Sequence, residues 1–253
     1  LGEYGTPNID IEEGWLDIEH NGRRDRVLFP KRPGSFYHLS KVHDSANLEF
    51  GCRIWNMRVT DLNQAVVYGI ETDEIGLAPD LHTSFHYDSV FGTVINRFIV
   101  QAVIGMPLTV YGKGRQTRGV INIRDTLRCV ELAALNPARP GEFRVFNQVT
   151  QQFSMNELAS MVIEAAEQKG IRVEAKHIAN PRTELEQHYY NVKHRALENL
   201  GLEPHLLTIA VLGRMIEVVR QHKSNILRGS ILPNITWQAG VMQEETVRTR
   251  VAV

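Results

Sequence analysis

The stretch SFYHLSK (residues 35–41) places Tyr37 and Lys41 four residues apart. Four residues are about one turn of a helix, so both side chains leave the same helical face. A free tyrosine titrates near ~10, and a neighbouring ammonium group favours its phenolate, as a general base requires. The pair therefore predicts a tyrosine that takes part in proton transfer.

The sequence around this pair predicts a helix followed by a strand. Apolar residues recur at steps of three and four from Phe36 to Phe50, and Ser35 can cap the helix start. Residues 58–63 are typical of a strand, and residues 64–69 of a polar loop that it enters. A catalytic helix of a doubly wound sheet requires this order, because ligands collect beyond the carboxyl ends of the strands.

Two other spacings carry less weight. Tyr189 and Lys193 are also four residues apart, but they lie in a polar stretch without that frame of helix and strand, so we assign the catalytic role to Tyr37. His82 and His86 have the same spacing without an HExxH motif or an evident third ligand. We therefore predict no metal site.

Composition limits the functions open to the chain. Its 253 residues are 43% hydrophobic, enough for the core of one large or two small domains. The net charge of -1 gives no reason to expect nucleic acid or an anionic membrane, and no apolar run reaches spanning length, so we expect a soluble protein. Cys52 and Cys129 lack a CxxC spacing and are expected to be buried thiols in a reducing compartment.

Further segments alternate between helical and strand patterns. The predicted helices cover residues 91–105, 124–136, 154–169 and 206–222, and the further predicted strands cover residues 108–111 and 143–147. Ser154 and Glu157 form a capping box at the third of these helices. Residues 11–34 and the glycine-rich stretch 112–119 are expected to be loops. The alternation predicts an α/β fold.

Three segments carry a resemblance to a known family. The helix YHLSKVHDS (37–45), the loop GEYGTPNIDIEEG (2–14) and residues 108–125 are similar to those of the UDP-sulfoquinovose synthases. These enzymes are extended short-chain dehydrogenases of the NAD-dependent epimerase/dehydratase family. The loop makes the resemblance specific, because sugar-nucleotide epimerases share the YxxxK spacing but not this loop. The similarity covers nearly the whole chain and fades after about residue 222.

The resemblance implies a fold and a division of the chain. We expect the C-terminal portion of a Rossmann-type extended short-chain dehydrogenase with a smaller substrate-binding subdomain. The family's catalytic threonine would precede Leu1, and the sequence has no GxGxxG dinucleotide loop, so we expect part of the enzyme to lie upstream. Residues 1–70 are expected to form the C-terminal half of the NAD-binding domain with its catalytic helix. Residues 71–235 are expected to form mainly the UDP-sugar-binding subdomain, with residues 120–150 returning to the Rossmann sheet. Residues 236–253 are expected to be a loose tail.

The resemblance also implies a reaction. Members of the family bind NAD, oxidise UDP-glucose at C4, eliminate water to a 4-keto-5-ene, add sulfite at C6 and return the hydride, which makes UDP-sulfoquinovose for sulfolipids. By the matching motif, Tyr37 takes the proton of the C4 hydroxyl, and Lys41 favours the phenolate and holds the nicotinamide ribose. His38 either acts at the C6 or sulfite side or is an exposed helical residue, and both readings stay open.

Two arginines are expected to meet the diphosphate, because arginine presents planar donors to phosphate oxygens. They are Arg118 in the glycine-rich stretch and Arg182 in the sequence Asn-Pro-Arg. The other positions that match substrate contacts of the family are Gln64, Thr93, Asn96, Leu108, Thr109, Val110 and Asn180. Val67 matches a position on the nicotinamide side.

Two other functions stay open from the residues alone. The chain could act as an NAD-dependent nucleotide-sugar epimerase or dehydratase, or it could be a catalytically incomplete fragment that only binds a UDP-sugar. The resemblance further implies a homodimer and, in a plastid, a ferredoxin-dependent glutamate synthase as the partner that supplies sulfite. We expect the protein in a bacterial cytoplasm or in the chloroplast stroma.

Overall fold

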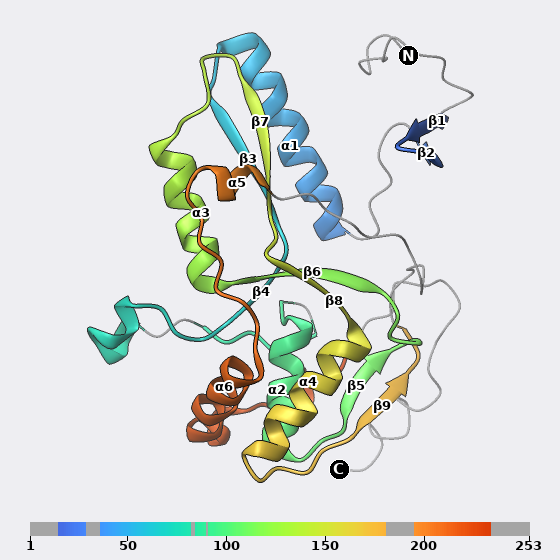
Figure 1. Ribbon diagram of the computed structural model, residues 1–253, viewed down its shortest axis with the longest axis vertical. Coiled ribbons are helices and arrows are strands. Elements are labelled where there is room, and N and C mark those ends of the chain that lie inside the picture. The colour runs from blue at the N-terminus through green and yellow to red at the C-terminus, as the bar shows by residue number, and fades with distance from the viewer. Residues whose placement is uncertain (1–14, 29–35, 82–83, 90, 181–194, 234–253) are drawn as a thin grey trace, which may run out of the picture.

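The computed structural model describes residues 15–28, 36–81, 84–89, 91–180 and 195–233, and their elements form two bodies joined by a three-stranded sheet (Figure 1). The Tyr-helix body consists of α1 (Phe36–Trp55), β3 (Val59–Gln64), α3 (Ile123–Leu135), β7 (Phe143–Gln148) and α5 (Arg195–Asn199). The large-core body consists of α2 (Val94–Ile104), β5 (Leu108–Tyr111), α4 (Met155–Gln168), β9 (Ala175–Ile178) and α6 (Ile209–Gln221). The joint sheet consists of β4 (Val66–Tyr68), β6 (Thr117–Asn122) and β8 (Gln151–Ser154).

The Tyr-helix body is built on two parallel strands. β3 pairs with β7 from Val59 opposite Phe143 to Gln64 opposite Gln148. Ser45 donates a hydrogen bond of 2.6 Å from α1 to the carboxylate of Asp61 on β3. The predicted helix and the predicted strands at 58–63 and 143–147 are thus confirmed, and so is the α/β fold class.

Two segments predicted to be loops contribute strands to the joint sheet. Within the predicted loop 64–69, β4 pairs in parallel with β6 from Val66 opposite Val120 to Tyr68 opposite Asn122. Within the predicted loop 112–119, residues 117–119 already belong to β6, which is antiparallel to β8. Both short strands depend on partners distant in the sequence, so local turn signals gave the wrong prediction.

The large-core body holds the main hydrophobic core, which α2, α4 and α6 share with β5. Thr93 caps α2 by accepting a hydrogen bond from the amide of Asn96, and Gly105 ends it with a left-handed φ of 74°. Ser154 and Glu157 form the predicted capping box at α4. The predicted helices 91–105, 124–136, 154–169 and 206–222 are confirmed, each with small differences at its ends.

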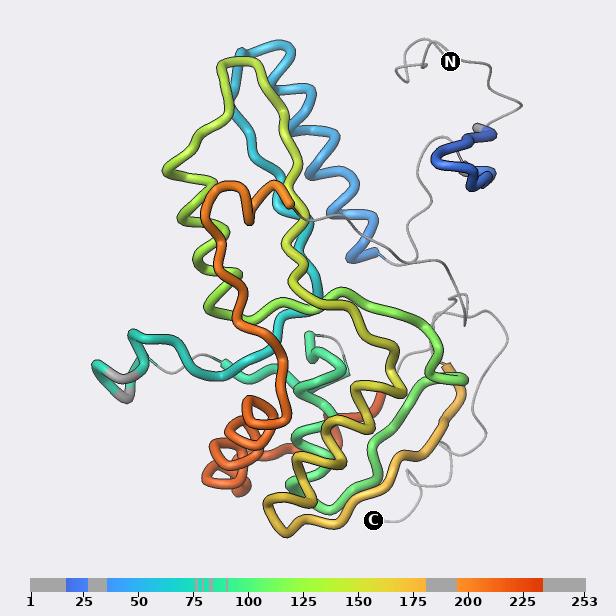
Figure 2. Tube along the Cα trace, viewed as in Figure 1, coloured from blue at the N-terminus to red at the C-terminus, as the bar shows by residue number. Residues whose placement is uncertain are grey.

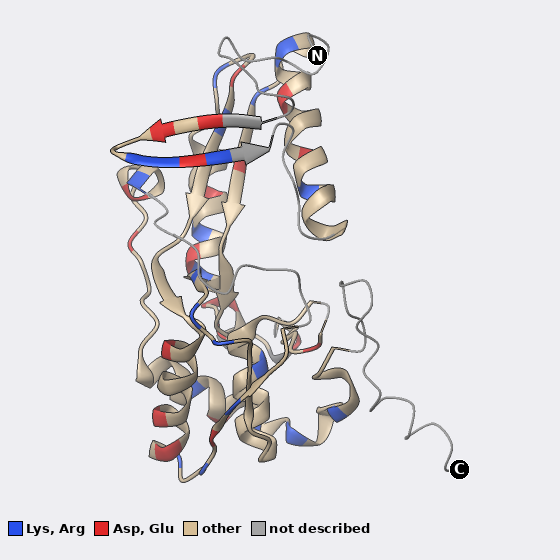
Figure 3. Cartoon of the chain, turned by 90° about the vertical axis from the view of Figure 1, so that its right-hand side faces the viewer, with Lys and Arg blue, Asp and Glu red and all other residues tan. Residues whose placement is uncertain are grey.

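An antiparallel hairpin replaces part of the loop predicted at 11–34. β1 (Trp15–His20) and β2 (Arg23–Leu28) pair across a two-residue turn, in which Asn21 and Gly22 have φ of 51° and 72°. Asp17 and Glu19 of β1 lie opposite Arg26 and Arg24 of β2, so acidic positions on one strand face basic positions on the other (Figure 3). Asn-Gly between two alternating segments is a hairpin signal, so the sequence contained the information that the loop prediction overlooked.

Both cysteines are free and buried, as predicted. Burial raises the pKa of the Cys129 thiol to about 11, which keeps it protonated at neutral pH. Among the residues that the structure describes, no helix combines the length and apolar character needed to cross a membrane. The loop at 2–14, the second pair Tyr189 and Lys193, and the tail beyond residue 235 lie outside the described residues.

Candidate active site

The first turn of α1 carries Tyr37 with its side chain 66% exposed. Figure 1 shows this end of α1 directed toward the large-core body. The ring of Tyr37 meets the imidazole of His38 edge-on, with the ring centroids 5.7 Å apart. Ser40 donates a hydrogen bond of 2.8 Å to the carbonyl of Tyr37, which fixes this turn of the helix. The phenol is therefore open to a substrate that approaches from outside the helix.

Lys41 lies one turn further along the same face. Its Nζ is 5.8 Å from the centroid of the Tyr37 ring and 3.0 Å from a carboxylate oxygen of Asp44. The hydrogen bond to Asp44 and the charge of that carboxylate raise the pKa of Lys41, so its ammonium stays protonated. The predicted pair thus shares a helical face, and the structure adds Asp44, which the sequence analysis did not single out.

The loop that follows β5 and the segment that follows β9 emerge at one edge of the large-core body. The two strands are parallel, with Tyr111 opposite Ile178, so their carboxyl ends coincide. The amide of Gly112 donates to the carbonyl of Ile178 at 2.9 Å. Asn180 follows two residues later and is half-buried. The glycine-rich loop and Asn180 are thereby brought together, while Arg182 lies outside the described residues.

The glycine-rich loop is held tightly against the start of α4. The amide of Asn156 donates to the carbonyl of Gly114 at 3.0 Å, and its side chain donates to the carbonyl of Lys113 at 3.0 Å. Gly114 has a left-handed φ of 69°, and a Cβ there would come within 2.6 Å of the Val110 side chain. The loop conformation therefore requires glycine at this position.

Arg97 organises the predicted substrate positions on β5 and was not identified from the sequence. It is only 8% exposed, and its guanidinium lies 4.2 Å from the centroid of the Tyr111 ring and donates to the carbonyl of Thr109 at 3.1 Å. Gln101 exchanges two hydrogen bonds with Thr109, at 2.8 and 3.0 Å. Because Arg97 sits in an apolar helical run and its partner is twelve residues away, only the fold brings them together.

The remaining predicted substrate residues differ in accessibility. Leu108, Thr109 and Val110 are buried in β5. Leu108 and Val110 belong to the main core, and the hydroxyl of Thr109 accepts a hydrogen bond from Gln101. Asn96 is buried and donates to the carbonyl of His86 at 3.0 Å, but its Oδ1 accepts no hydrogen bond from the described residues. Arg118 is half-buried at the start of β6. Gln64 is exposed at the end of β3, and Val67 is half-buried in β4.

A recess of about 560 Å³ lies elsewhere, between α6 and the segment after β4. Its charged side chains neutralise one another. Arg214 binds Glu71 at 2.6 Å, and Arg124 binds Asp73 at 3.1 Å. No cluster of three possible metal-ligating side chains occurs within the described ranges. None of the residues that line this recess is a site residue predicted from the sequence.

The curated proteins similar to this chain include two UDP-sulfoquinovose synthases. The chain is 54% identical over 248 residues to a chloroplastic UDP-sulfoquinovose synthase of Spinacia oleracea, covering 98% of this chain and 52% of that protein. It is 40% identical over 241 residues to a UDP-sulfoquinovose synthase of Sulfolobus acidocaldarius, covering 94% of this chain and 61% of that protein. The chain thus spans between half and two thirds of the length of these relatives. The family resemblance predicted from the sequence is confirmed.

Solved structures share the fold. A UDP-glucose 4-epimerase of Thermotoga maritima with UDP-glucose superposes with a TM-score of 0.57 at 21% identity, covering 74% of this chain and 53% of the epimerase. A dTDP-glucose 4,6-dehydratase of Streptomyces venezuelae with NAD gives a TM-score of 0.57 at 18% identity, covering 77% of this chain and 54% of the dehydratase. These matches confirm the predicted Rossmann-type fold, which the chain shares with the epimerase and the dehydratase. No protein-family model matches the chain.

Proposed function

We propose that the chain supplies the catalytic helix and most of the UDP-sugar site of a UDP-sulfoquinovose synthase, which converts UDP-glucose and sulfite to UDP-sulfoquinovose and water. The observation that carries this proposal is the exposed Tyr37 with Lys41 one helical turn away, 5.8 Å from the ring centroid. The identity of 54% to a relative of that name supports the choice of substrate.

The residues present fit one end of a bound NAD. Tyr37 and Lys41 offer a phenol and an ammonium on one exposed face, which suits the hydroxyls of the nicotinamide ribose, and Val67 offers an apolar contact on the nicotinamide side. When bound, NAD supplies reversible hydride acceptance at C4 of the sugar. The solved structures of similar fold that contain NAD support this cofactor.

The proposed roles of the α1 residues follow from their exposure and charge. Tyr37 takes the proton of the C4 hydroxyl, and the ammonium of Lys41 stabilises the phenolate. His38 is exposed beside Tyr37, in edge contact with its ring, and we assign it a proton transfer at the C6 side, where water leaves and sulfite adds. These roles come from the matching family motif and are assigned here to the residues of α1.

The proposed site of the UDP-sugar is formed mainly by the large-core body, together with Arg118 of the joint sheet and Gln64 at the end of β3. Arg118 and Arg182 are placed at the diphosphate, where guanidinium groups form paired hydrogen bonds with phosphate oxygens. The Oδ1 of Asn96, which accepts no hydrogen bond from the described part of the chain, is a buried polar atom suited to a substrate donor. The proposed further contacts come from Gln64, Thr93, Leu108, Thr109, Val110 and Asn180.

The division of the chain and its partners belong to the same proposal. Residues 1–70, with 120–150 returning to them, would form the cofactor side, and residues 71–235 would form mainly the sugar side; the parallel pairing of β3 with β7 supports this division. A homodimer through α1 is supported by its exposed apolar residues Phe50, Ile54 and Trp55. The name of the spinach relative supports the chloroplast stroma as one compartment, and a glutamate synthase as sulfite donor rests on the family resemblance.

The proposal is tested with labelled sulfite. The protein is incubated with UDP-glucose in the presence and absence of sulfur-35 sulfite, and the nucleotide sugars are separated and identified by mass. We expect the label in a UDP-hexose only when sulfite is present. A new UDP-hexose that forms equally well without sulfite would instead identify an epimerase or dehydratase. Denaturing the protein and measuring the released NAD and NADH tests the cofactor separately.

A further inference from the structure

One segment connects the two bodies directly. The strap, defined as residues 200–208, runs from α5 in the Tyr-helix body to α6 in the large-core body, as the tube in Figure 2 shows. Leu202 is 6% exposed and belongs to the small hydrophobic cluster with Cys129 and Leu132 of α3. Leu207 is 3% exposed and belongs to the main core. The strap therefore anchors one leucine in each body.

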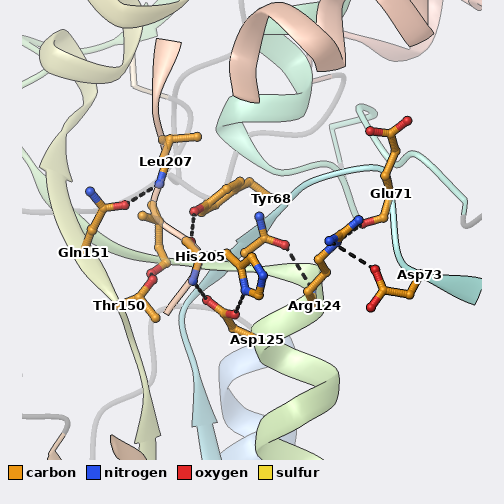
Figure 4. A network of polar contacts seen from close by, with 11 residues as sticks. Tyr68, Glu71, Asp73, Arg124, Asp125, Thr150, Gln151, His205 and Leu207 are labelled. Atoms are coloured by element: carbon orange, nitrogen blue, oxygen red, sulfur yellow. Dashed lines mark hydrogen bonds and ion pairs between the residues drawn. The ribbon is translucent and has the colours of Figure 1, made fainter. Parts of the chain in front are cut away.

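Between these two leucines, His205 is bound on three sides. Its backbone amide donates to one carboxylate oxygen of Asp125 at 2.8 Å, and its Nδ1 lies 2.6 Å from the other. Its carbonyl accepts a hydrogen bond of 2.7 Å from the hydroxyl of Tyr68 (Figure 4). We call these three residues the clasp. Asp125 comes from the first turn of α3 and Tyr68 from the end of β4, so the clasp joins a helix of the Tyr-helix body to the joint sheet.

The partners of His205 are deeply buried, which makes the clasp specific. Asp125 is 1% exposed and Tyr68 is fully buried, whereas the imidazole itself is 54% exposed at its side chain. A buried carboxylate is costly unless both oxygens are hydrogen-bonded, and His205 supplies a donor to each. Burial raises the pKa of Tyr68 well above its usual range, so its hydroxyl remains a donor. The amide and the carbonyl of these contacts belong to the backbone of His205, so only the Nδ1 contact with Asp125 depends on its side chain.

Two neighbouring contacts extend the clasp. The amide of Leu207 donates to the side-chain carbonyl of Gln151 on β8 at 2.6 Å, so the strap is bound to the opposite edge of the joint sheet as well. Arg124, next to Asp125, donates to the carbonyl of Glu71 at 3.2 Å and pairs with Asp73. β6, whose second residue is the proposed diphosphate residue Arg118, leads directly into α3 at the clasp.

We propose that Asp125, His205 and Tyr68 are positioning residues that fix the orientation of the Tyr-helix body relative to the large-core body. The inference rests on the proposed function for its chemical consequence: Tyr37 of the Tyr-helix body must meet a sugar whose nucleotide is held mainly by the large-core body. A misplacement of about 1 Å between reacting groups can cost about 100-fold in rate. The hydrogen bonds among the three residues join the strap, α3 and β4, so the clasp acts through the relation of the two bodies.

The orientation can be measured without turnover. Spin labels on cysteines introduced at Asn47 of α1 and Glu164 of α4, both exposed, report the distance between the bodies by double electron–electron resonance. In the full chain we expect one narrow distance distribution. Asp125→Asn, which sets an amide donor against the donors of His205, and Tyr68→Phe, which removes one hydroxyl, should broaden or shift it. The exposed His222→Ala is the matched control and should leave it unchanged. An unchanged distribution in both clasp variants would overturn the proposal.

Kinetics then give the chemical consequence. We expect Asp125→Asn and Tyr68→Phe to lower kcat per folded molecule by about tenfold or more while the Kd for UDP, measured by calorimetry, changes less than about twofold. His205→Asn keeps a side-chain donor near Asp125 and should recover part of the loss seen with His205→Ala. Equal losses in kcat and UDP affinity would contradict a positioning role. The unmodified protein could fail to convert UDP-glucose while the clasp substitutions still change the distance distributions. That result would contradict the proposed function but support the role of the clasp in fixing the orientation of the two bodies.

Discussion

The ammonium of Lys41 lies 3.0 Å from the carboxylate of Asp44, on the side of the helix that also carries Tyr37. The same ammonium is 5.8 Å from the centroid of the Tyr37 ring. In this arrangement Asp44 is the direct partner of the lysine, and Tyr37 is its next neighbour along the helix. Binding of a cofactor ribose at Lys41 would therefore compete with Asp44, which links cofactor binding to the charge environment of the phenol.

Replacing Tyr37 by phenylalanine tests the proton-transfer role. Because general acid–base catalysis contributes about 10²- to 10⁴-fold, we expect Tyr37→Phe to lower kcat by that range with little change in the affinity for UDP. Labelled sulfite incorporation provides the rate. Tyr189→Phe, which alters the second pair of the same spacing, serves as the control and should retain activity. A Tyr37→Phe protein with normal turnover would exclude this residue as the base.

The titration of Lys41 tests its contact with Asp44. The hydrogen bond and charge of Asp44 raise the pKa of Lys41 above its ordinary 10.5. The contribution of this ion pair to the stability of the folded chain is therefore complete below pH 10.5 and is lost as the pH rises through the raised pKa. In Asp44→Asn the Lys41 titration, followed by NMR of its side chain, should move back toward 10.5. Glu49→Gln, which alters the separate pair with Arg53, should not move it.

Asp44→Asn is expected to have little effect on the stability of the fold. Both side chains of the pair are more than half exposed, at 58% and 59%, so solvent screens the interaction. We therefore expect Asp44→Asn to leave the thermal unfolding midpoint at pH 7 nearly unchanged. A marked loss of stability would show that Asp44 has a structural partner beyond Lys41.

Local patterns predicted much of the fold, and long-range pairing accounts for what they missed. The capping box at Ser154 and the helix end at Gly105 depend on neighbouring residues, so the sequence alone located them. The hairpin turn at Asn21 was also local but was overlooked. β8 and β9, each of four residues, form because distant strands pair with them, and no local pattern marks them.

The candidate site divides in the same way. Tyr37 and Lys41 lie one turn apart, so their common face follows from spacing alone. The pairing of Asp125 with His205 spans 80 residues, and nothing near either residue indicates the other. Buried Arg97 likewise reads as part of an apolar helix until the fold brings Thr109 beside it. Sequence patterns can therefore suggest exposed chemistry, while buried polar contacts that position it require the structure.

Two glycines with similar backbone angles separate conformational strain from packing. Gly114 and Gly105 have φ of 69° and 74°, but only a Cβ at Gly114 would meet other atoms, including the Val110 side chain at 2.6 Å. We expect Gly105→Ala to cost about 1 kcal/mol in the free energy of unfolding, and Gly114→Ala about 1–3 kcal/mol more, because the loop must move from α4. Urea unfolding measures both. Equal costs would show that the loop relaxes without strain.

The buried arginine of α2 provides the last test. Arg97→Lys keeps the positive charge but cannot stack on Tyr111 in the same way or donate to the Thr109 carbonyl from a planar group, so a buried carbonyl loses its partner. We expect about 1–3 kcal/mol of lost unfolding free energy by urea denaturation, together with weaker UDP binding by calorimetry, because Thr109 lies at a proposed nucleotide position. The exposed Arg172→Lys is the matched control and should change neither quantity. Reduced stability with unchanged UDP affinity would confine Arg97 to the core and remove the end of β5 from the proposed nucleotide site.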